Sequence, residues 1–410
     1  MKIIHVTHCY HPSRGGVQWF FKNVSERLVS DYGDDVTVVT TDSMYGPERL
    51  KHERISPAEE VINGVKVIRF AYQRNHIKLL QITARILRRL LLPVPEVLMT
   101  KLYGPLSSGM KHYLLNTPAD AICAGSSNYH YMRLPLWKAC NFFYFGSIHL
   151  HDDPSIPVLT RIQRKSIQAS RLYIANTNYE KLRLIEAGIN PEKIKVLGVG
   201  VDEKIFEVDQ SDVTAYRKDL NIPGGALLIA YAGRIEKTKN VKILIDAFVQ
   251  INKEHPDVYL LIAGAGGDYA DELKTYCNAL PVAVQEKIRW KINFDISEKA
   301  LLFNSMDILV LPSNNESFGI VFLETWACKK PVIGADIGAV RHVISEGEDG
   351  LLMQVNDKES LCSKLNLLIT NHQLRISMGA KGFEKVKKNY TWDIITQKLR
   401  QCYLGHYHVN

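Results

Sequence analysis

The segment from residue 307 to 324 restricts the fold of this chain more than any other part of it. An apolar run from Asp307 to Leu311 predicts a buried parallel strand, which Pro312 and two asparagines end. Gly319 then begins an apolar segment that reaches Cys328 and predicts a short helix. A loop that enters a helix leaves backbone N–H groups without partners, and together these groups form an anion site. The groups belong to Phe318, Gly319 and Ile320.

Glu324 lies one turn inside this predicted helix, on the same face as Ile320. A carboxylate would repel a bound phosphate, unless it accepts hydrogen bonds from sugar hydroxyls beside that phosphate. The segment can therefore hold a phosphate and a hydroxyl-rich ligand within one turn, as a nucleotide sugar requires. The alternative interpretation needs no ligand, because Ser313 and Glu316 have the spacing of a helix capping box.

Composition limits the class of protein. With 410 residues, 46% hydrophobic and 23% charged, the chain has the size and balance of two soluble globular domains. The seven cysteines form no C-x-x-C pair, which favours reduced thiols in a cytosol and no zinc or iron–sulfur site. The net charge of +8 fits a polyanionic ligand or an anionic membrane surface, and no nucleic-acid-binding motif is present. No signal peptide is expected, because a strand pattern begins at Lys2.

The first forty residues predict the fold class. Strand patterns at residues 2–7 and 36–40 flank a helical pattern at residues 17–28, which predicts a doubly wound parallel sheet of the α/β class. Gly15 and Gly16 stand after the first strand, at the sheet edge where ligands bind. We interpret the pair as a close approach of backbone to a diphosphate or an acceptor. A plain tight turn is the alternative.

Residues 74–92 combine basic and apolar side chains at helical spacing. Such a basic amphipathic helix is typical of proteins that lie on anionic bilayers. The alternative is an ordinary surface helix with its apolar face turned inward. The basic members are Arg74, Lys78, Arg85, Arg88 and Arg89.

A second sheet begins near residue 227. The polar residues 203–224 predict a linker, so we expect an N-terminal domain at 1–205, a C-terminal domain at 206–388 and a final helical segment at 389–410. Arg234 and Lys239 follow the first strand of the second domain. Two cations at the carboxyl end of a strand can neutralise a leaving diphosphate as it gains charge. Lys237 is a nearby alternative, and a solvated charge run is the interpretation without a ligand.

These motifs together resemble the retaining glycosyltransferases of family four, also called glycosyl transferases group 1. Glu316, Phe318-Gly319 and Glu324 reproduce the E-x7-E pattern of that family, and His11-Pro-x-x-Gly-Gly-Val17 is similar to its first loop. Two asparagines, Asn240 and Asn293, stand where the family usually has glycine. The resemblance implies the GT-B fold, in which two Rossmann-like domains face a cleft and the last helix crosses back to the first domain.

The resemblance also implies roles for the site residues. The donor diphosphate is expected at Gly16, Arg234, Lys239 and the amides of Phe318, Gly319 and Ile320. Glu324 is expected to bind the ribose, while His149 and Glu316 face the transferred sugar as catalytic residues. The substrates implied are a nucleotide sugar, such as a UDP- or GDP-sugar, and a glycan or lipid-linked acceptor. No cofactor and no obligatory metal are implied.

Three alternatives stay open at this point. Asp152-Asp153 could be a metal-binding motif of the other nucleotide-sugar fold, GT-A, but no second ligand set accompanies it. A sugar-nucleotide epimerase shares the two-domain plan and would need its own acid/base carboxylates. A non-catalytic, membrane-associated scaffold would not need the Arg234, Lys239, Glu316 and Glu324 set. The expected setting is bacterial surface-polysaccharide (for example lipopolysaccharide) biosynthesis in the cytoplasm, peripheral to the inner face of the plasma membrane if residues 74–92 bind lipid.

Overall fold

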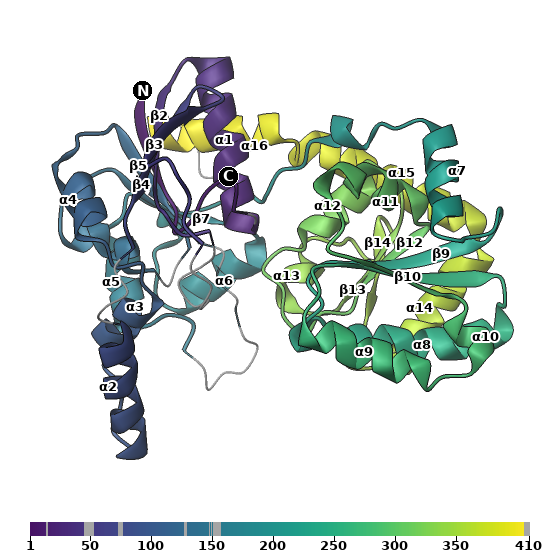
Figure 1. Cartoon of the computed structure of the whole chain (residues 1–410). Helices are drawn as coiled ribbons and strands as arrows, with labels where there is room; N and C mark the ends of the chain where they lie inside the picture. Colours follow the sequence, from purple (N-terminus) through teal and green to yellow (C-terminus); the bar gives the residue numbers. More distant parts are fainter. Residues whose placement is uncertain are drawn as a thin grey trace. The chain divides into compact units, whose positions relative to one another are not determined.

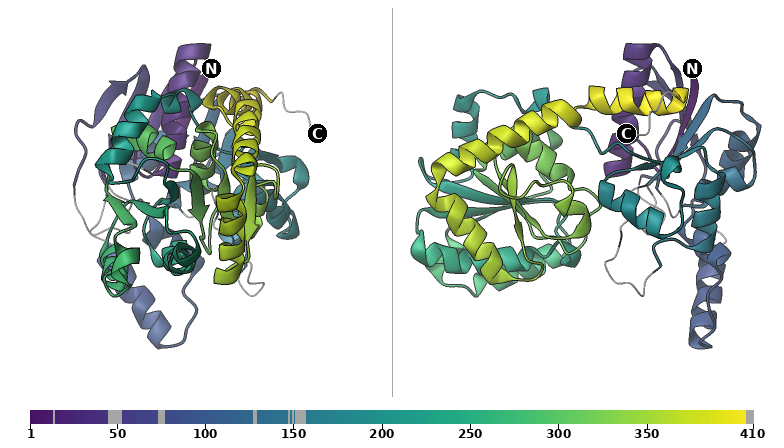
Figure 2. Two further views of the ribbon diagram at one scale, coloured as in Figure 1. Left: turned by 90° about the vertical axis from the view of Figure 1, so that its right-hand side faces the viewer. Right: turned by 180° about the vertical axis from the view of Figure 1, so that it is seen from behind.

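The chain forms two compact α/β units, seen in a computed structural model (Figures 1 and 2). The structure describes residues 1–13, 15–44, 53–72, 77–126, 129–146, 148, 150 and 157–405. Unit 1 comprises Met1–Val199 and the C-terminal segment from Trp392, and unit 2 comprises Gly200–Thr391. The predicted domains end instead at residues 205 and 388, and the predicted final segment corresponds to the part of unit 1 that begins at Trp392.

Unit 1 is built on an eight-stranded sheet with the order β3-β4-β2-β1-β5-β6-β7-β8. All neighbouring strands are parallel except β3 and β4. The central strands are buried apolar runs, which is typical of a parallel sheet covered on both faces. The strands are β1 (Lys2–Val6), β2 (Asp35–Thr41), β3 (Glu59–Ile62), β4 (Val65–Phe70), β5 (Ala121–Ala124), β6 (Phe142–Phe145), β7 (Leu172–Ala175) and β8 (Ile194–Val196).

The C-terminal helix α16 (Trp392–Leu404) packs against α1 (Gly16–Tyr32) of the same unit. Tyr403 reaches the buried His5 of β1 at 3.0 Å, and Arg400 donates to Asp34 at 2.8 Å. The last helix therefore completes the first domain, as the fold class predicts. The other described helices of unit 1 are α2 (Ile77–Arg89), α3 (Glu96–Tyr103), α4 (Ser108–Asn116), η1 (His130–Leu136), α5 (Arg161–Ala169), α6 (Asn178–Glu186) and η2 (Pro191–Lys193).

Unit 2 contains a six-stranded, fully parallel sheet with the order β11-β10-β9-β12-β13-β14. This is the strand order 3-2-1-4-5-6 of the dinucleotide-binding fold, in which the winding direction reverses between the first and fourth strands. Here the reversal lies between β9 and β12. The strands are β9 (Leu227–Ala232), β10 (Val258–Gly264), β11 (Ile288–Ile292), β12 (Ile308–Leu311), β13 (Val332–Ala335) and β14 (Gly350–Met353).

Helices cover both faces of the second sheet, with α8 and α9 on one side and α11 and α12 on the other (Figure 1). This arrangement buries the apolar strands on both faces. The α-helices of unit 2 are α7 (Gln210–Asp219), α8 (Val241–Glu254), α9 (Asp268–Asn278), α10 (Val282–Gln285), α11 (Lys299–Ser305), α12 (Ile320–Ala327), α13 (Gly338–Arg341), α14 (Lys358–Thr370) and α15 (His372–Asn389), and the short turns are η3 (Glu203–Phe206), η4 (Lys237–Lys239) and η5 (Ile296–Glu298).

The predicted doubly wound α/β class is confirmed, but the prediction of a linker at residues 203–224 is wrong. That segment contains η3 and α7, and α7 packs on α11. Arg217 of α7 donates to Ser305 O at 2.8 Å and pairs with Asp307 at 3.2 Å. The polar residues of α7 mislead because only one narrow face of this short helix, carrying Val213 and Tyr216, is buried. None of the described helices has the length and hydropathy to cross a membrane.

Candidate functional site: the carboxyl edge of the second sheet

The loops that follow β9 and β12 lie side by side at the point where the winding of the second sheet reverses. Asn314 N donates to Thr238 O at 3.0 Å, which joins the loop after β12 to the loop after β9. In open α/β sheets, ligands bind outside the carboxyl ends of the strands at this reversal point. The sheet order thus brings together two segments that lie 77 residues apart in the sequence at Lys239 and Glu316. These segments include most of the predicted site residues.

Lys239 and Glu316 form an ion pair across these two loops. Both side chains are mostly buried, with 10% and 13% of their surfaces exposed, and Lys239 Nζ also lies 3.4 Å from Asn315 O. The family resemblance assigns the lysine to the diphosphate and the glutamate to the transferred sugar. The contact shows that the two groups share one site, so a ligand there meets a cation and a carboxylate together.

Glu324 has a partner that the sequence analysis missed. Its carboxylate is almost fully buried on α12 and pairs with Lys299, the first residue of α11. Burying a carboxylate is costly unless it is paired and hydrogen-bonded, and Lys299 supplies the compensating charge. Only the sheet order reveals this pair, because no motif links residues 299 and 324.

Arg234 is the exposed cation of the group. Its guanidinium is 55% exposed and pairs with Glu236 at 2.7 Å, while its backbone carbonyl accepts a hydrogen bond from Tyr231 at 2.6 Å. An exposed ion pair of this kind contributes little to stability. The backbone of Arg234 is therefore fixed, while its guanidinium can exchange Glu236 for an anionic ligand at a small cost in free energy.

The N-terminus of α12 carries no side-chain cap. Gly319 is the N-cap residue and has φ 87°, a left-handed conformation that is unfavourable for any residue with a side chain. A Cβ atom at this position would also lie 2.5 Å from the Phe322 ring. The capping box of Ser313 and Glu316 is not formed, since the helix begins only at Ile320. Within the described residues, two buried polar atoms beside this terminus, Ser313 Oγ and Asn315 Oδ1, have no hydrogen-bond partner. Such orphaned groups are uncommon in a folded protein, and these two are free to bond a polar ligand.

Two asparagines adopt the backbone conformation for which the family usually has glycine. Asn240 and Asn293 both adopt left-handed conformations, with φ of 53° and 52°. Asparagine tolerates this region better than other residues with side chains. Asn293 also accepts a hydrogen bond from Gly266 N at 3.1 Å and so closes the glycine loop after β10. The departures from the expected glycines therefore leave the backbone of the site intact.

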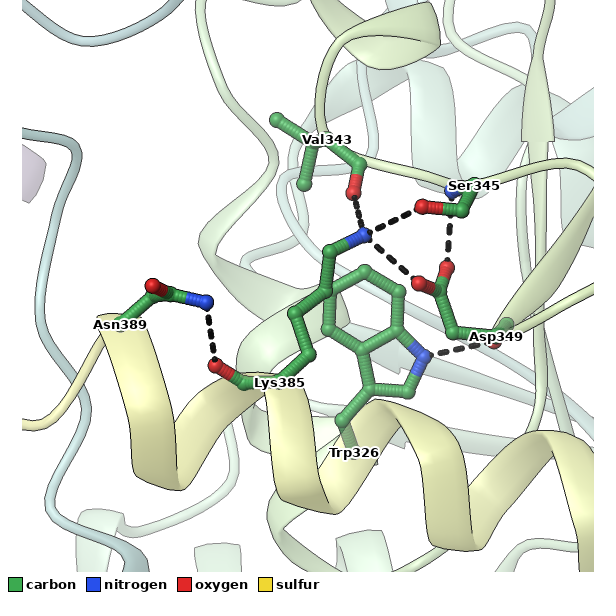
Figure 3. A network of polar contacts seen from close by, with 6 residues as sticks. All are labelled: Trp326, Val343, Ser345, Asp349, Lys385 and Asn389. Carbon is green, nitrogen blue, oxygen red and sulfur yellow. Dashed lines mark hydrogen bonds and ion pairs between the residues drawn. The ribbon is translucent and has the colours of Figure 1, made fainter.

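A polar network joins the C-terminal part of α12 to the loop before β14 and to α15 (Figure 3). Trp326, two residues after Glu324, donates its indole N–H to Asp349 O at 2.8 Å. Lys385 of α15 lies over the Trp326 ring and donates to Asp349 Oδ2 at 2.6 Å and Ser345 Oγ at 3.0 Å. The indole is fully buried, so the end of the site helix is fixed by both packing and hydrogen bonds.

The corresponding edge of unit 1 has a different chemistry. Gly16 begins α1, after the loop that follows β1, and Gly15 is its N-cap without a side-chain hydrogen bond. In the same loop His8 is buried, stacks on Tyr129 with ring centroids 4.3 Å apart and lies 3.2 Å from Gln18. Burial lowers the pKa of His8 to about 4, so the imidazole is neutral at pH 7. Its position directly after a strand was the signal that could have identified it.

His149, the predicted catalytic histidine, lies outside the described residues, as do Asp152 and Asp153. The adjoining Ile148 is described, and its backbone N–H donates to Glu180 at 3.3 Å. Glu180 is fully buried, and burial raises the pKa of its carboxyl group although Tyr173 and Asn176 N donate hydrogen bonds to it. Glu180 thus holds the segment after β6 in place. The sequence did not indicate this role, because an acidic residue in the first turn of a helix is common. The role of His149 stays a prediction.

Two family models match adjoining parts of the chain. Glycosyltransferase Family 4 matches residues 14–204, and Glycosyl transferases group 1 matches residues 212–385. The chain belongs to this family of glycosyltransferases.

Individual relatives and structures agree with this assignment. The D-inositol 3-phosphate glycosyltransferase of Corynebacterium efficiens is 30% identical over 190 residues, which are 46% of this chain and 45% of that protein. The matching region thus spans about half the length of this curated relative. Among solved structures, Anabaena HepE in complex with UDP superposes with a TM-score of 0.72 at 17% identity, covering 99% of this chain and 100% of that one. Sucrose-phosphate synthase of Thermosynechococcus elongatus superposes with a TM-score of 0.73 at 17% identity, with 98% of each chain covered. These structures share the GT-B fold.

Proposed function

We propose that this protein is a retaining glycosyltransferase, which moves a hexose or related sugar from a nucleotide-sugar donor to a glycan or lipid-linked acceptor. The observation that carries the proposal is the cluster at the reversal point of unit 2. There a buried lysine–glutamate pair, an exposed arginine and an uncapped helix N-terminus meet at one sheet edge. A diphosphate with a sugar on each side needs this combination of cations, amides and carboxylates.

The diphosphate is assigned to the cationic part of the cluster. Arg234, Lys239 and the amides of Phe318 to Ile320 would stabilise the negative charge that grows on the leaving nucleoside diphosphate. Glu324 would accept hydrogen bonds from the ribose. Glu316, which already touches Lys239, would lie where the diphosphate joins the transferred sugar. In unit 1, we keep Gly16 as a diphosphate residue and His149 as a catalytic residue.

The chemical step follows from the state of Glu316. A carboxylate tied to an ammonium group is a poor nucleophile, so a covalent glycosyl-enzyme on Glu316 is disfavoured. In the front-face route, the bond between the anomeric carbon and the diphosphate oxygen breaks while the acceptor oxygen forms its bond on the same face. The acceptor's proton passes to the departing phosphate oxygen. The anomeric configuration is retained and no protein carboxylate is modified.

A lipid-linked acceptor is supported by a cavity in unit 1. About 210 Å³ lies between α3, η1, β6 and α5, and its walls are mostly apolar, with one guanidinium and the carboxylate of Glu96 among them. The apolar part of an acceptor would fit such a lining. Bacterial surface-polysaccharide assembly in the cytoplasm, including lipopolysaccharide, uses acceptors of this kind and is the setting we propose. The wall includes Met99, Tyr103, Met132, Arg133, Tyr144 and Ile162.

A donor panel tests the proposal directly. UDP- and GDP-sugars would be incubated with the protein and an acceptor-containing lipid extract, and both donor depletion and product anomer would be measured by NMR. Transfer with retained configuration supports the proposal. Conversion of the donor into its epimer without acceptor would instead indicate an epimerase, and no turnover of any donor would indicate a scaffold.

Metal independence is a separate part of this proposal. With the active donor, turnover should survive excess EDTA, because cations of the protein are assigned to the diphosphate. Loss of turnover on chelation, restored by Mn²⁺ or Mg²⁺, would contradict it.

A further inference from the structure

Helix α2 turns an apolar stripe away from the protein. At about 3.6 residues per turn, Leu79, Ile82, Ile86 and Leu90 fall on one side of the helix. Their exposed fractions lie between 49% and 63%. The opposite side carries Ala84, which is buried, with Leu80 and Leu87 half-buried. An ordinary surface helix would do the reverse and bury its largest apolar stripe.

The residues that follow α2 extend the apolar surface. Leu90, Leu91 and Leu92 are 63%, 93% and 50% exposed. Leu91 also has φ 53°, an unfavourable left-handed conformation for a leucine. Both views in Figure 2 show α2 extending away from the sheet of unit 1, and α2 contacts α3 at its base. In the described part of unit 1, this tip is thus a concentrated group of uncovered leucines.

Positive charge borders the apolar stripe. Arg85 and Arg89 project from the helix beside Ile82, and Arg88 lies further round; all three are exposed. No acidic residue occurs from residue 77 to residue 95. An apolar stripe of this kind, edged on one side by basic residues alone, matches the boundary between acyl chains and anionic headgroups. A second copy of α2 would bring these arginines together, and an acidic protein would leave the leucines uncovered.

We propose that α2 and the Leu90–Leu92 turn form a docking element for an anionic lipid bilayer. The stripe lies among the acyl chains near the surface, Arg85 and Arg89 contact phosphate headgroups, and Arg88 adds positive charge close to them. Because α3 follows α2 directly and lines the apolar cavity of unit 1, docking brings that cavity to the membrane surface. The inference goes beyond the proposed activity, and vesicle binding can be measured without donor or acceptor.

The experiment is flotation of the full chain with vesicles of phosphatidylcholine alone or mixed with phosphatidylglycerol. We expect binding to the anionic vesicles, weakened by salt. Arg85→Gln/Arg88→Gln/Arg89→Gln should lower the partition coefficient about a hundredfold at low salt, since each basic residue near the surface contributes roughly fivefold. Ile82→Ser/Ile86→Ser/Leu90→Ser should abolish binding although the charges remain.

A matched control removes the same charge elsewhere. Lys218, Lys253 and Lys381 are exposed residues of unit 2, and changing all three to Gln should leave vesicle binding unchanged. Melting temperatures of all variants should agree, because every substituted residue is at the surface. The proposal is overturned if the parent protein does not bind anionic vesicles, or if the arginine variant binds as well as the parent. It is also overturned if light scattering shows a dimer that the serine variant dissociates.

Discussion

The two sheets share one plan, but their carboxyl edges differ in charge. In unit 2 the edge holds Lys239 and Lys299, each paired with a mostly buried carboxylate. In unit 1 the edge after β1 holds His8, a buried imidazole that is neutral at pH 7 and stacked on Tyr129. The same order of the parallel strands therefore places paired cations at one edge and a neutral imidazole at the other. We interpret this as a division in which unit 2 binds most of the donor and unit 1 binds the acceptor, with Gly16 and His149 as the donor contacts assigned to unit 1.

The largest predicted effect tests whether unit 2 depends on its rear anchor. Lys385→Met should lower the free energy of unfolding of unit 2 by about 3 kcal/mol, because it leaves the buried Asp349 carboxylate without its cation. Unit 1 should be unaffected. Hydrogen exchange of β12 and of β1, followed by mass spectrometry, separates the two units. Equal loss of protection in β12 and β1 would show that unit 2 does not depend on Lys385 more than unit 1 does.

The next prediction concerns the cation of the site itself. Lys239→Ala should reduce turnover by roughly a hundredfold or more, since it removes charge stabilisation from the leaving diphosphate. The exposed Lys242, which pairs with Asp246 along α8, offers a control, and Lys242→Ala should retain most of the activity. Near-normal kinetics of a folded Arg234→Ala/Lys239→Ala variant would remove the diphosphate assignment.

A smaller effect separates the units by pH. Burial lowers the pKa of His5 to about 3, whereas the three histidines of unit 2, at 255, 342 and 372, are exposed or half-buried. Between pH 6.5 and 3 the unfolded chain binds the proton that folded His5 refuses, so stability falls as pH falls. At pH 5 the loss is about 2 kcal/mol for a group with this shift.

Hydrogen exchange at pH 7 and pH 5, corrected for intrinsic rates, should therefore show greater loss of protection in β1 than in β9. His5→Gln should reduce this difference, and His342→Gln should not change it. If β9 loses protection first, the buried histidines do not control the acid stability of the chain.

Much of the second domain could be predicted from the sequence. The strand ending at Leu311 and the helix after Gly319 were expected because Pro312 and Gly319 are strong local signals, and β12 and α12 lie there. The second sheet begins at residue 227 as predicted, with β9. Turn chemistry and continuous apolar runs are local properties, which explains why they can be recognised without the fold.

The partners of the site residues could not be predicted in the same way. Lys299 meets Glu324, and Lys239 meets Glu316, only because the sheet order places α11 beside α12 and β9 beside β12. Likewise, the sequence of α2 shows an amphipathic helix but not which face is covered. That depends on packing between separate elements: α3 contacts α2, and Ala84 is buried.

The assignment of Glu324 and Glu316 is tested most directly by calorimetric titration with nucleoside diphosphate, using UDP and GDP with Glu324→Gln and Glu316→Gln. Glutamine keeps the shape of the side chain but loses about 1.5–3 kcal/mol of charge-assisted hydrogen bonding, a tenfold to hundredfold change in affinity. Because Glu324 is assigned to the ribose, Glu324→Gln should weaken the nucleotide by this amount, while Glu316→Gln should retain its affinity and lose turnover with the sugar donor. Melting temperatures must first show that both variants are folded. Lost nucleotide affinity in Glu316→Gln, with unchanged affinity in Glu324→Gln, would contradict the account.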